Sequence, residues 1–319
     1  MTLLNVENLK TYFETRGGFV KAVDGVSLHI EKGDAFGLVG ESGCGKTTTV
    51  LSIMRLLPSN GRVISGKILF DGVDIIAIDE EKMRKDILWK KMSMVFQGAM
   101  NALNPVFRVG DQIVQAIRLH EDIRKESSWK RVEELFSLVG IDPKRARDYP
   151  HEFSGGMKQR VIIAMALACN PDLVIADEPV TALDVVVQAQ ILELIRNLRE
   201  KLGLSMIMIT HDLSVVADTC NKVAVMYAGK IVEQGDIVTV FKNPMHPYPQ
   251  GLLTNYPSIK AEKKKFAPIR GSPPNLISPP LGCRFHPRCS YAMEICRMEE
   301  PETVEITRGH YISCHKMNY

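Results

Sequence analysis

The chain has 319 residues, with 40 basic and 37 acidic side chains and a formal net charge of +3. This length can bury a large core, and we expect one large domain plus a smaller one. The balanced charge gives no reason to expect nucleic-acid binding. We expect no secretory signal, because the first residues contain no basic region followed by an apolar run. We expect no membrane span, because the longest apolar run, Val161 to Cys169, is about half of what a bilayer requires.

The N-terminal region alternates apolar and polar residues, which predicts antiparallel strands over residues 2–35 with a turn at Gly17-Gly18. A continuous apolar run at 35–39 predicts a buried strand, and a helix is expected over 47–57. Further strands are expected at 64–73 and 91–96.

The middle of the chain has helical periodicity from about 105 to 165, for example in Trp129 to Val139. Apolar runs at 172–176 and 205–209 predict strands of a parallel sheet that is buried on both faces, with an amphipathic helix over 185–202 between them. These patterns predict an α/β fold with an antiparallel β subdomain and an inserted helical subdomain at about 98–165.

The composition of the chain changes after Gly235, where frequent prolines would interrupt any long helix or strand. We therefore expect a large domain over residues 1–240. Residues 241–319 are expected to form a linker and a small, irregular, cysteine-rich module.

A glycine-rich stretch between a predicted strand and a predicted helix, Gly40 to Thr47, fits the phosphate-loop pattern and predicts a P-loop NTPase core. Its backbone N–H groups can converge on phosphates, Lys46 supplies a positive charge, and Thr47 supplies a hydroxyl for Mg²⁺. The expected ATP contacts here are Gly40, Ser42, Gly43, Cys44, Gly45, Lys46, Thr47 and Thr48.

Two adjacent carboxylates end the predicted strand at 172–176. Asp177 can hold the metal through water, and Glu178 is the candidate to orient or deprotonate the attacking water. Without the other motifs, an acidic pair that caps a strand is the alternative.

Two further strand ends carry polar side chains. His211 follows the strand at 205–209, at the edge where ligand contacts gather in α/β sheets, and could contact the γ-phosphate or the water. Gln97 follows the strand at 91–96 and could touch Mg²⁺ or the water; alone, either residue is more often structural.

A second anion-binding turn is expected where Ser154, Gly155, Gly156 and Met157 open a helix. Because the chain already has one phosphate loop, we expect this turn to serve the nucleotide of another subunit. Asp184 directly precedes the helix expected over 185–202, and we expect it to be the N-cap of that helix. Tyr12 and Phe13 could stack on adenine, and core packing is an equal alternative.

Together, these motifs resemble the ATP-binding subunit of an ABC transporter over residues 1 to about 245. The resemblance implies that Gly40 to Thr47 is the Walker A loop, Asp177 and Glu178 the Walker B pair, and Ser154 to Met157 the signature. It further implies Gln97 as the Q-loop glutamine, Asp184 in the D-loop and His211 as the switch histidine, with ATP and Mg²⁺ as cofactors.

The chain is more closely similar to the first ATPase subunit of oligopeptide and dipeptide importers. The residues that carry this resemblance are Phe153 to Met157, Asn104-Pro105, Ala182 to Ile191 and His246 to Leu253. It implies a peripheral protein on the cytoplasmic face of the membrane. The implied partners are a second, non-identical ATPase subunit, two transmembrane permeases and an extracytoplasmic solute-binding protein.

Four cysteines in the last tenth of the chain, Cys283, Cys289, Cys296 and Cys314, favour metal over disulfides in a reducing cytosol. Their spacing contains no Cys-x2-Cys pair, and four thiolates can hold either zinc or a [4Fe–4S] cluster. The resemblance implies the cluster. We expect it to be structural, so that Cys289→Ser loosens the tail and leaves nucleotide binding largely unchanged.

The resemblance implies an ATPase motor for the import of di- and oligopeptides, with oligosaccharides, nickel or glutathione as alternative solutes. A soluble ABC ATPase acting on nucleic acid or ribosomes is a second class. Such proteins usually carry tandem cassettes or long basic coiled-coil insertions, and the sequence has neither.

Overall fold

The computed structural model describes residues 1–98, 102–254 and 269–318 and divides into two compact units. The first unit contains residues 1–76 and 209–319, and the second contains residues 77–208. Part of the expected linker, 255–268, lies outside the described residues.

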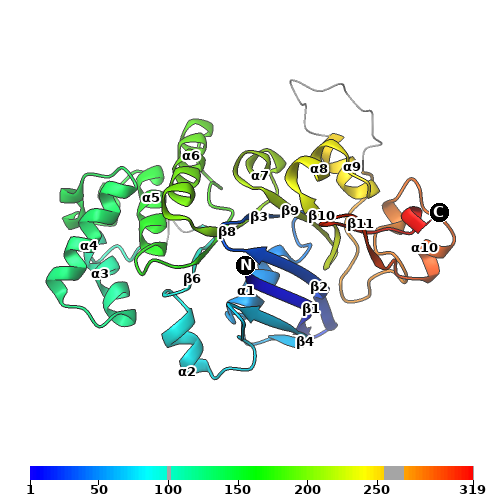
Figure 1. Ribbon diagram of the computed structural model, residues 1–319, viewed down its shortest axis with the longest axis horizontal. Helices are drawn as coiled ribbons and strands as arrows, with labels where there is room; N and C mark the ends of the chain where they lie inside the picture. Colours follow the sequence, from blue (N-terminus) through cyan, green and yellow to red (C-terminus); the bar gives the residue numbers. More distant parts are fainter. Residues whose placement is uncertain (99–101, 255–268, 319) are drawn as a thin grey trace. The chain divides into compact units, whose positions relative to one another are not determined.

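The first unit contains the antiparallel subdomain that the N-terminal alternation predicts. Its four strands follow the order β2-β1-β4-β5, and Figure 1 shows β2, β1 and β4 side by side. They are β1 (Thr2–Thr15), β2 (Gly18–Glu31), β4 (Gly61–Phe70) and β5 (Val73–Asp74). Thr15 pairs with Gly18, so the turn lies at Arg16 and Gly17, one residue earlier than predicted.

A second sheet in this unit carries the phosphate loop. Its strands follow the order β11-β12-β10-β9-β3, and β3 runs parallel to β9. Their bounds are β3 (Ala35–Val39), β9 (Lys222–Tyr227), β10 (Lys230–Asp236), β11 (Thr303–Thr307) and β12 (His310–Ser313). The tail therefore contributes two strands to this sheet.

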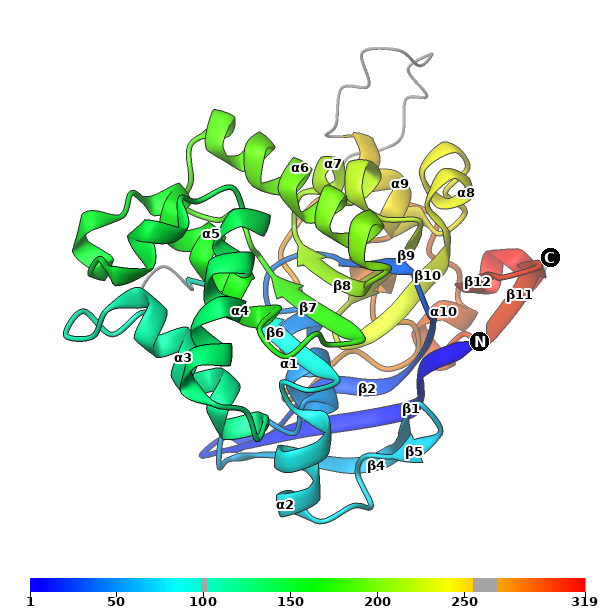
Figure 2. The ribbon, with the colours of Figure 1, turned by 60° about the vertical axis from the view of Figure 1, so that its left-hand side comes forward.

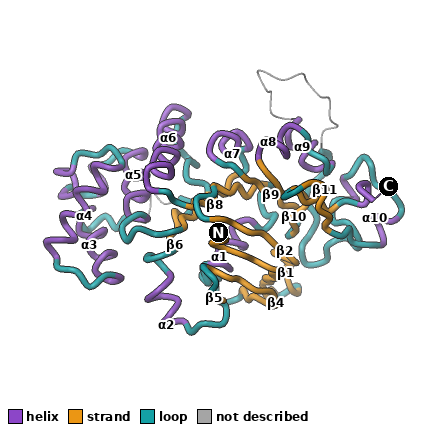
Figure 3. The backbone as a smooth tube through the Cα atoms, in the orientation of Figure 1, coloured by secondary structure: helices purple, strands orange, loops and turns teal. Residues whose placement is uncertain are grey.

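Helices of the first unit are short. They are α1 (Lys46–Ile53), α7 (Leu213–Thr219), α8 (Ile237–Lys242), α9 (Pro247–Thr254) and α10 (Ile295–Met298). The helix expected to reach Leu57 ends at Ile53, and Arg55 has a φ of +55°, which no right-handed helix accommodates. Much of the tail around α10 is loop (Figure 3).

The second unit contains β6 (Met92–Val95), which runs parallel to β7 (Leu173–Asp177). The next strand, β8 (Ser205–Thr210), crosses the boundary between the units. Figure 2 shows β6, β7 and β8 next to one another and α3, α4 and α5 grouped together. The helices are α2 (Glu80–Lys82), α3 (Val109–His120), α4 (Lys125–Leu138), α5 (Gly155–Ala166) and α6 (Val185–Leu202), with a π-helical turn at Met83–Ile87 and 3-10 turns at Pro143–Arg147 and Pro150–Glu152.

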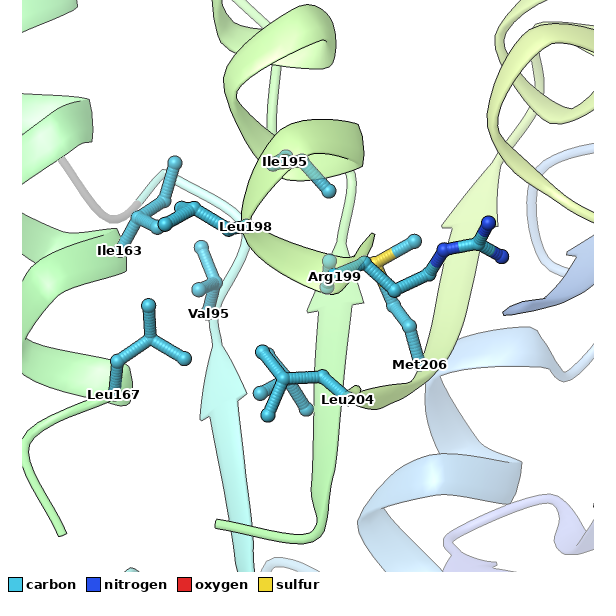
Figure 4. Close-up of a pocket in the computed structure, with 10 residues that line it drawn as sticks. Val95, Ile163, Leu167, Ile195, Leu198, Arg199, Leu204 and Met206 are labelled. Atoms are coloured by element: carbon cyan, nitrogen blue, oxygen red, sulfur yellow. The ribbon is translucent and has the colours of Figure 1, made fainter. Parts of the chain in front are cut away.

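Helices α5 and α6 cover one face of β6, β7 and β8 in this unit (Figure 4). Between them lies a small cavity of about 30 Å³ whose lining is almost wholly apolar. Its lining residues include Val95, Ile163, Leu198 and Met206. This apolar packing fixes the strand ends that carry Gln97 and Asp177. Among the described residues, no helix is long and apolar enough to cross a membrane.

A buried carboxylate ties β3 to the segment before β9. Asp34 accepts hydrogen bonds from Lys222 Nζ (2.8 Å), Asn221 Nδ2 (3.0 Å) and the backbone N–H of Glu31 (2.8 Å). Asn221 Oδ1 in turn accepts from the N–H of Ala35 at 2.7 Å. This network fixes the start of the strand that leads into the phosphate loop.

Asp34→Asn is expected to lower the free energy of unfolding by about 1–3 kcal/mol at neutral pH, because it removes the charge from these hydrogen bonds. Burial by itself raises the pKa of Asp34, but the bonds from Lys222, Glu31 and Asn221 outweigh it and leave that pKa below its usual value. Its stabilisation is therefore present above about pH 4 and lost as the pH falls through the folded-state pKa.

Urea unfolding of the parent and the variant from neutral pH to about pH 3 measures this difference. Glu81→Gln is the control, because it breaks an exposed ion pair with Lys85. An Asp34→Asn deficit that is the same at both ends of the pH range would contradict the account.

Candidate nucleotide site

The phosphate loop connects β3 to α1 in the first unit. Lys46 is buried, and its Nζ donates to the carbonyl oxygens of Gly40 (2.7 Å) and Glu41 (3.0 Å). Gly40 and Gly45 have φ values of +149° and +108°. A Cβ on either would come within 2.2 Å of a backbone oxygen, of Met226 and Ala22 respectively. Only glycine fits at these two positions.

The other loop residues differ in exposure. Cys44 is buried, and burial raises the pKa of its thiol. Ser42, Gly43 and Thr47 are exposed and Thr48 is half-buried. An exposed hydroxyl directly after a buried lysine fits the role predicted for Thr47 toward Mg²⁺.

The two candidate adenine-stacking residues both make packing contacts on β1. Tyr12 donates its hydroxyl to Asp24 Oδ1 at 2.8 Å, and burial, with help from Asp24, raises the pKa of Tyr12 to about 12. The ring of Phe13 lies against Gly61, where a Cβ would come within 2.7 Å of it. Both side chains remain half-buried, so stacking on adenine stays a prediction.

His211 follows β8 in the first unit, as predicted, and its side chain is exposed. Asp212 then caps α7 by accepting from the N–H of Ser214 at 2.8 Å. The histidine therefore occupies a short, capped connection between strand and helix.

The second unit brings Gln97 and Glu178 together. Gln97 Nε2 donates to Glu178 Oε2 at 2.8 Å, because the two residues follow the parallel strands β6 and β7. Thr181 Oγ1 donates to the same oxygen at 3.0 Å. Glu178 has a φ of +48°, a strained conformation for a non-glycine residue and one that recurs at functional sites. Thr181 was not predicted, because it belongs to none of the sequence motifs.

Two other aspartates flank this pair in the second unit. Asp177 is buried at the last position of β7. Asp184 caps α6 by accepting from the N–H of Val187 at 3.0 Å, as its position predicts. The D-loop role of Asp184 stays a prediction.

The predicted second turn begins α5. Ser154 is its N-cap and accepts from the N–H of Met157 at 3.4 Å, and Ser154 and Gly155 are exposed. Arg145 steadies the turn, with Nη1 3.3 Å from Met157 Sδ and its guanidinium 4.7 Å from the ring centroid of Phe153. Arg145 was not predicted, because no sequence motif marks it.

Gly156→Ala is expected to lower the free energy of unfolding by about 1 kcal/mol, because the new methyl group overpacks the contact with Val187. A Cβ there would come within 2.6 Å of Val187 Cγ1. In a Val187→Ala chain the same change is expected to be neutral or to stabilise by up to about 1 kcal/mol, since alanine favours helix over glycine. Urea unfolding of the four chains tests this. Stabilisation by Gly156→Ala in both backgrounds would show that the contact imposes no constraint.

All four tail cysteines line one cavity in the first unit, together with His286 and His315. Burial raises the pKa of the Cys283 thiol to about 12, and the three neighbouring thiols add to this rise. Among the described residues, however, no three His, Cys, Asp or Glu side chains converge closely enough to hold one metal ion.

Comparison with known families gives two matches. Residues 23–181 match the ABC transporter family, and residues 232–296 match the C-terminal region of oligopeptide/dipeptide transporters.

Curated relatives align over nearly the whole chain. The oligopeptide transport ATP-binding protein OppD of Bacillus subtilis is 48% identical, with 97% of this chain and 87% of that protein covered. The dipeptide transport ATP-binding protein DppD of the same organism is 48% identical, with 98% and 94% covered. DppD of Escherichia coli is 44% identical, with 99% and 97% covered.

Solved structures share the fold. The ATP-binding cassette MJ0796 bound to ADP and Pi aligns with a TM-score of 0.65 at 25% identity, over 73% of this chain and 98% of that one. CbiO1 from Clostridium perfringens aligns with a TM-score of 0.65 at 28% identity, over 76% and 91%. These similarities confirm the α/β P-loop fold with its antiparallel sheet and helical subdomain.

Proposed function

We propose that this chain, which belongs to the ABC transporter family and within it to the oligopeptide and dipeptide transport ATP-binding proteins, is the motor that couples ATP binding and hydrolysis to peptide uptake. The observation that carries the proposal is 48% identity over 97–98% of the chain to proteins named for peptide transport. The match to the C-terminal region of that group supports the proposal over a part of the chain that lies outside the match to the ABC transporter family.

The residues of the site suggest a division of labour in ATP hydrolysis. Lys46 and the loop N–H groups bind the phosphates, and Glu178 orients or deprotonates the attacking water. The bonds from Gln97 and Thr181 support this role, because they fix the carboxylate in one orientation. His211 contacts the γ-phosphate or the water.

Mg²⁺ would be held by the Thr47 hydroxyl and, through water, by Asp177. It would neutralise charge on the phosphate oxygens.

The turn at Ser154 to Gly156, whose first two residues are exposed, supports a shared site. In this proposal its N–H groups bind the γ-phosphate of ATP held by a second, non-identical ATPase subunit, and that subunit does the same in return. The pair docks on two permeases at the cytoplasmic face of the membrane and works with an extracytoplasmic solute-binding protein. Nucleic acid has no part in it.

Two other functions are distinguished from this one by the experiments below. The same motor could serve an importer of oligosaccharides, nickel or glutathione, because the motor does not need to touch the solute. A soluble ATPase acting on nucleic acid or ribosomes is disfavoured by the match to the peptide-transport C-terminal region.

Glu178→Gln is expected to reduce the rate of ATP hydrolysis by about 10²–10⁴-fold and to leave ATP affinity nearly unchanged. The amide keeps the shape of the carboxylate but cannot take a proton. Hydrolysis is measured with the purified subunits, and uptake of a labelled dipeptide is measured in vesicles that contain the permeases and the solute-binding protein. Uptake should stop with the variant.

Glu193→Gln is the matched control, since Glu193 is an exposed carboxylate on α6. Undiminished hydrolysis by Glu178→Gln would show that Glu178 does not orient or deprotonate the attacking water. Uptake of an oligosaccharide, nickel or glutathione in place of the dipeptide would show that the proposed solute is wrong.

We also propose that Cys283, Cys289, Cys296 and Cys314 hold a [4Fe–4S] cluster. One zinc ion needs all four sulfurs at about 2.3 Å from a single point, whereas each cysteine of a cluster binds a separate iron. Thiols that surround one cavity without converging on a point fit the cluster better. When bound, the cluster would cross-link a tail that is mostly loop.

Anaerobically purified chain is expected to contain about four iron atoms and to absorb broadly in the visible range. Cys289→Ser should lose this absorption, whereas Cys169→Ser, at a buried thiol outside the tail, should keep it. Zinc at about one per chain with no iron would overturn the cluster.

A further inference from the structure

A half-buried arginine of the tail, Arg288, binds the phosphate loop directly. Arg288 ends a 3-10 turn (His286–Arg288) and immediately precedes Cys289. Its Nη1 and Nη2 donate to Glu41 Oε2 (2.6 Å) and Oε1 (3.0 Å), a bidentate pair. The Arg288 side chain is 7% exposed and that of Glu41 is 28% exposed, so this pair is partly shielded from solvent.

The remaining donors of Arg288 are used as well. Nε donates to the carbonyl of Arg270 (2.9 Å), Nη2 to that of Gly271 (3.0 Å) and Nη1 to the hydroxyl of Tyr227 (3.4 Å). An arginine has five N–H donors, and these three bonds with the two to Glu41 occupy all of them. The guanidinium is therefore fixed in one place, in a fork that a lysine cannot reproduce.

Glu41 is the second residue of the phosphate loop, and each of its polar groups has a partner. Its N–H donates to Tyr248 Oη at 3.0 Å, and its carbonyl accepts from Lys46 Nζ at 3.0 Å. Its carboxylate is a negative charge in a loop that has to receive a triphosphate. Arg288 neutralises that charge, and without it the carboxylate would repel the phosphates.

The same tail turn also forms part of the cysteine cavity. His286 donates its N–H to the carbonyl of Cys283 at 2.9 Å, and Arg288 donates its N–H to that of Phe285 at 2.9 Å. Cys283, Phe285, His286 and Cys289 line the cavity. A rearrangement of Cys283 or Cys289 therefore shifts the backbone that carries Arg288.

We propose that Arg288 is a positioning residue for ATP binding, which neutralises and fixes Glu41 and makes ATP affinity depend on an ordered cysteine module. The inference rests on the proposed function, because it takes the loop as the ATP site. It replaces the expectation from the sequence that changes at Cys289 leave nucleotide binding unchanged.

Equilibrium binding of ATP to the purified full chain tests whether the Arg288–Glu41 ion pair supports ATP affinity. Arg288→Met should weaken ATP binding about tenfold, because it leaves the Glu41 carboxylate unneutralised beside the phosphates. Glu41→Gln in the Arg288→Met chain should restore most of the lost affinity. Unchanged affinity in Arg288→Met would overturn the inference, and so would a double variant that binds no better than the single one.

A second comparison tests the link to the cysteines. Cys289→Ser should weaken ATP binding in the parent and have little further effect in the Arg288→Met chain. Ile312→Ala is the control, because Ile312 is a buried tail residue on β12 that pairs with Glu233 of β10 and lies outside the 3-10 turn that carries Arg288. It should lower stability and leave ATP affinity unchanged; a loss equal to that of Arg288→Met would overturn the inference.

These outcomes separate the inference from the proposed function. A parent chain that does not bind ATP would overturn both. If the parent chain binds ATP but its assembly with the permeases takes up no peptide, only the proposed function is contradicted.

Discussion

The phosphate loop depends on one buried ammonium group. Lys46 Nζ lies inside the loop, bonded to the carbonyl oxygens of Gly40 and Glu41. A buried charge is tolerated only with such partners, and the loop supplies them by turning its carbonyls inward. The strand before it, the helix after it and the two constrained glycines all serve this geometry. Arg288 of the tail binds the carboxylate of Glu41. Two positive charges therefore hold the loop, one from Lys46 within it and one from Arg288.

The carboxylate proposed to activate the water, Glu178, is held by two side chains of its own unit, the second one. Glu178 follows a buried strand, in a backbone conformation that costs energy, and its carboxylate is bonded to Gln97 and Thr181. The apolar packing of α5 and α6 over that sheet provides the stability that such a strained residue needs. Helix α5 also begins with the turn that we propose binds the ATP held by the partner subunit.

Local pattern was enough to predict most elements up to about residue 210. The strand expected at 64–73 is observed at 61–70, and the strands at 222–227, 230–236, 303–307 and 310–313 were not predicted. The helix at 185–202 has the bounds that its periodicity predicts, because a capping aspartate precedes it and Gly203 follows it. The helix after the phosphate loop ends early, since the backbone at Arg55 depends on tertiary context. Glu41 and Arg288 are 247 positions apart, and no spacing rule connects them. Arg145 and Thr181 were missed for the same reason: their roles come from contacts that only the folded chain makes.

Coupling of ATP hydrolysis to peptide uptake is tested by the ATPase rate of this subunit assembled with its permeases and second ATPase subunit in vesicles. We expect the rate to rise when the solute-binding protein is loaded with a peptide, and uptake to accompany the rise. A rate that ignores the peptide and responds instead to nucleic acid or ribosomes would contradict it.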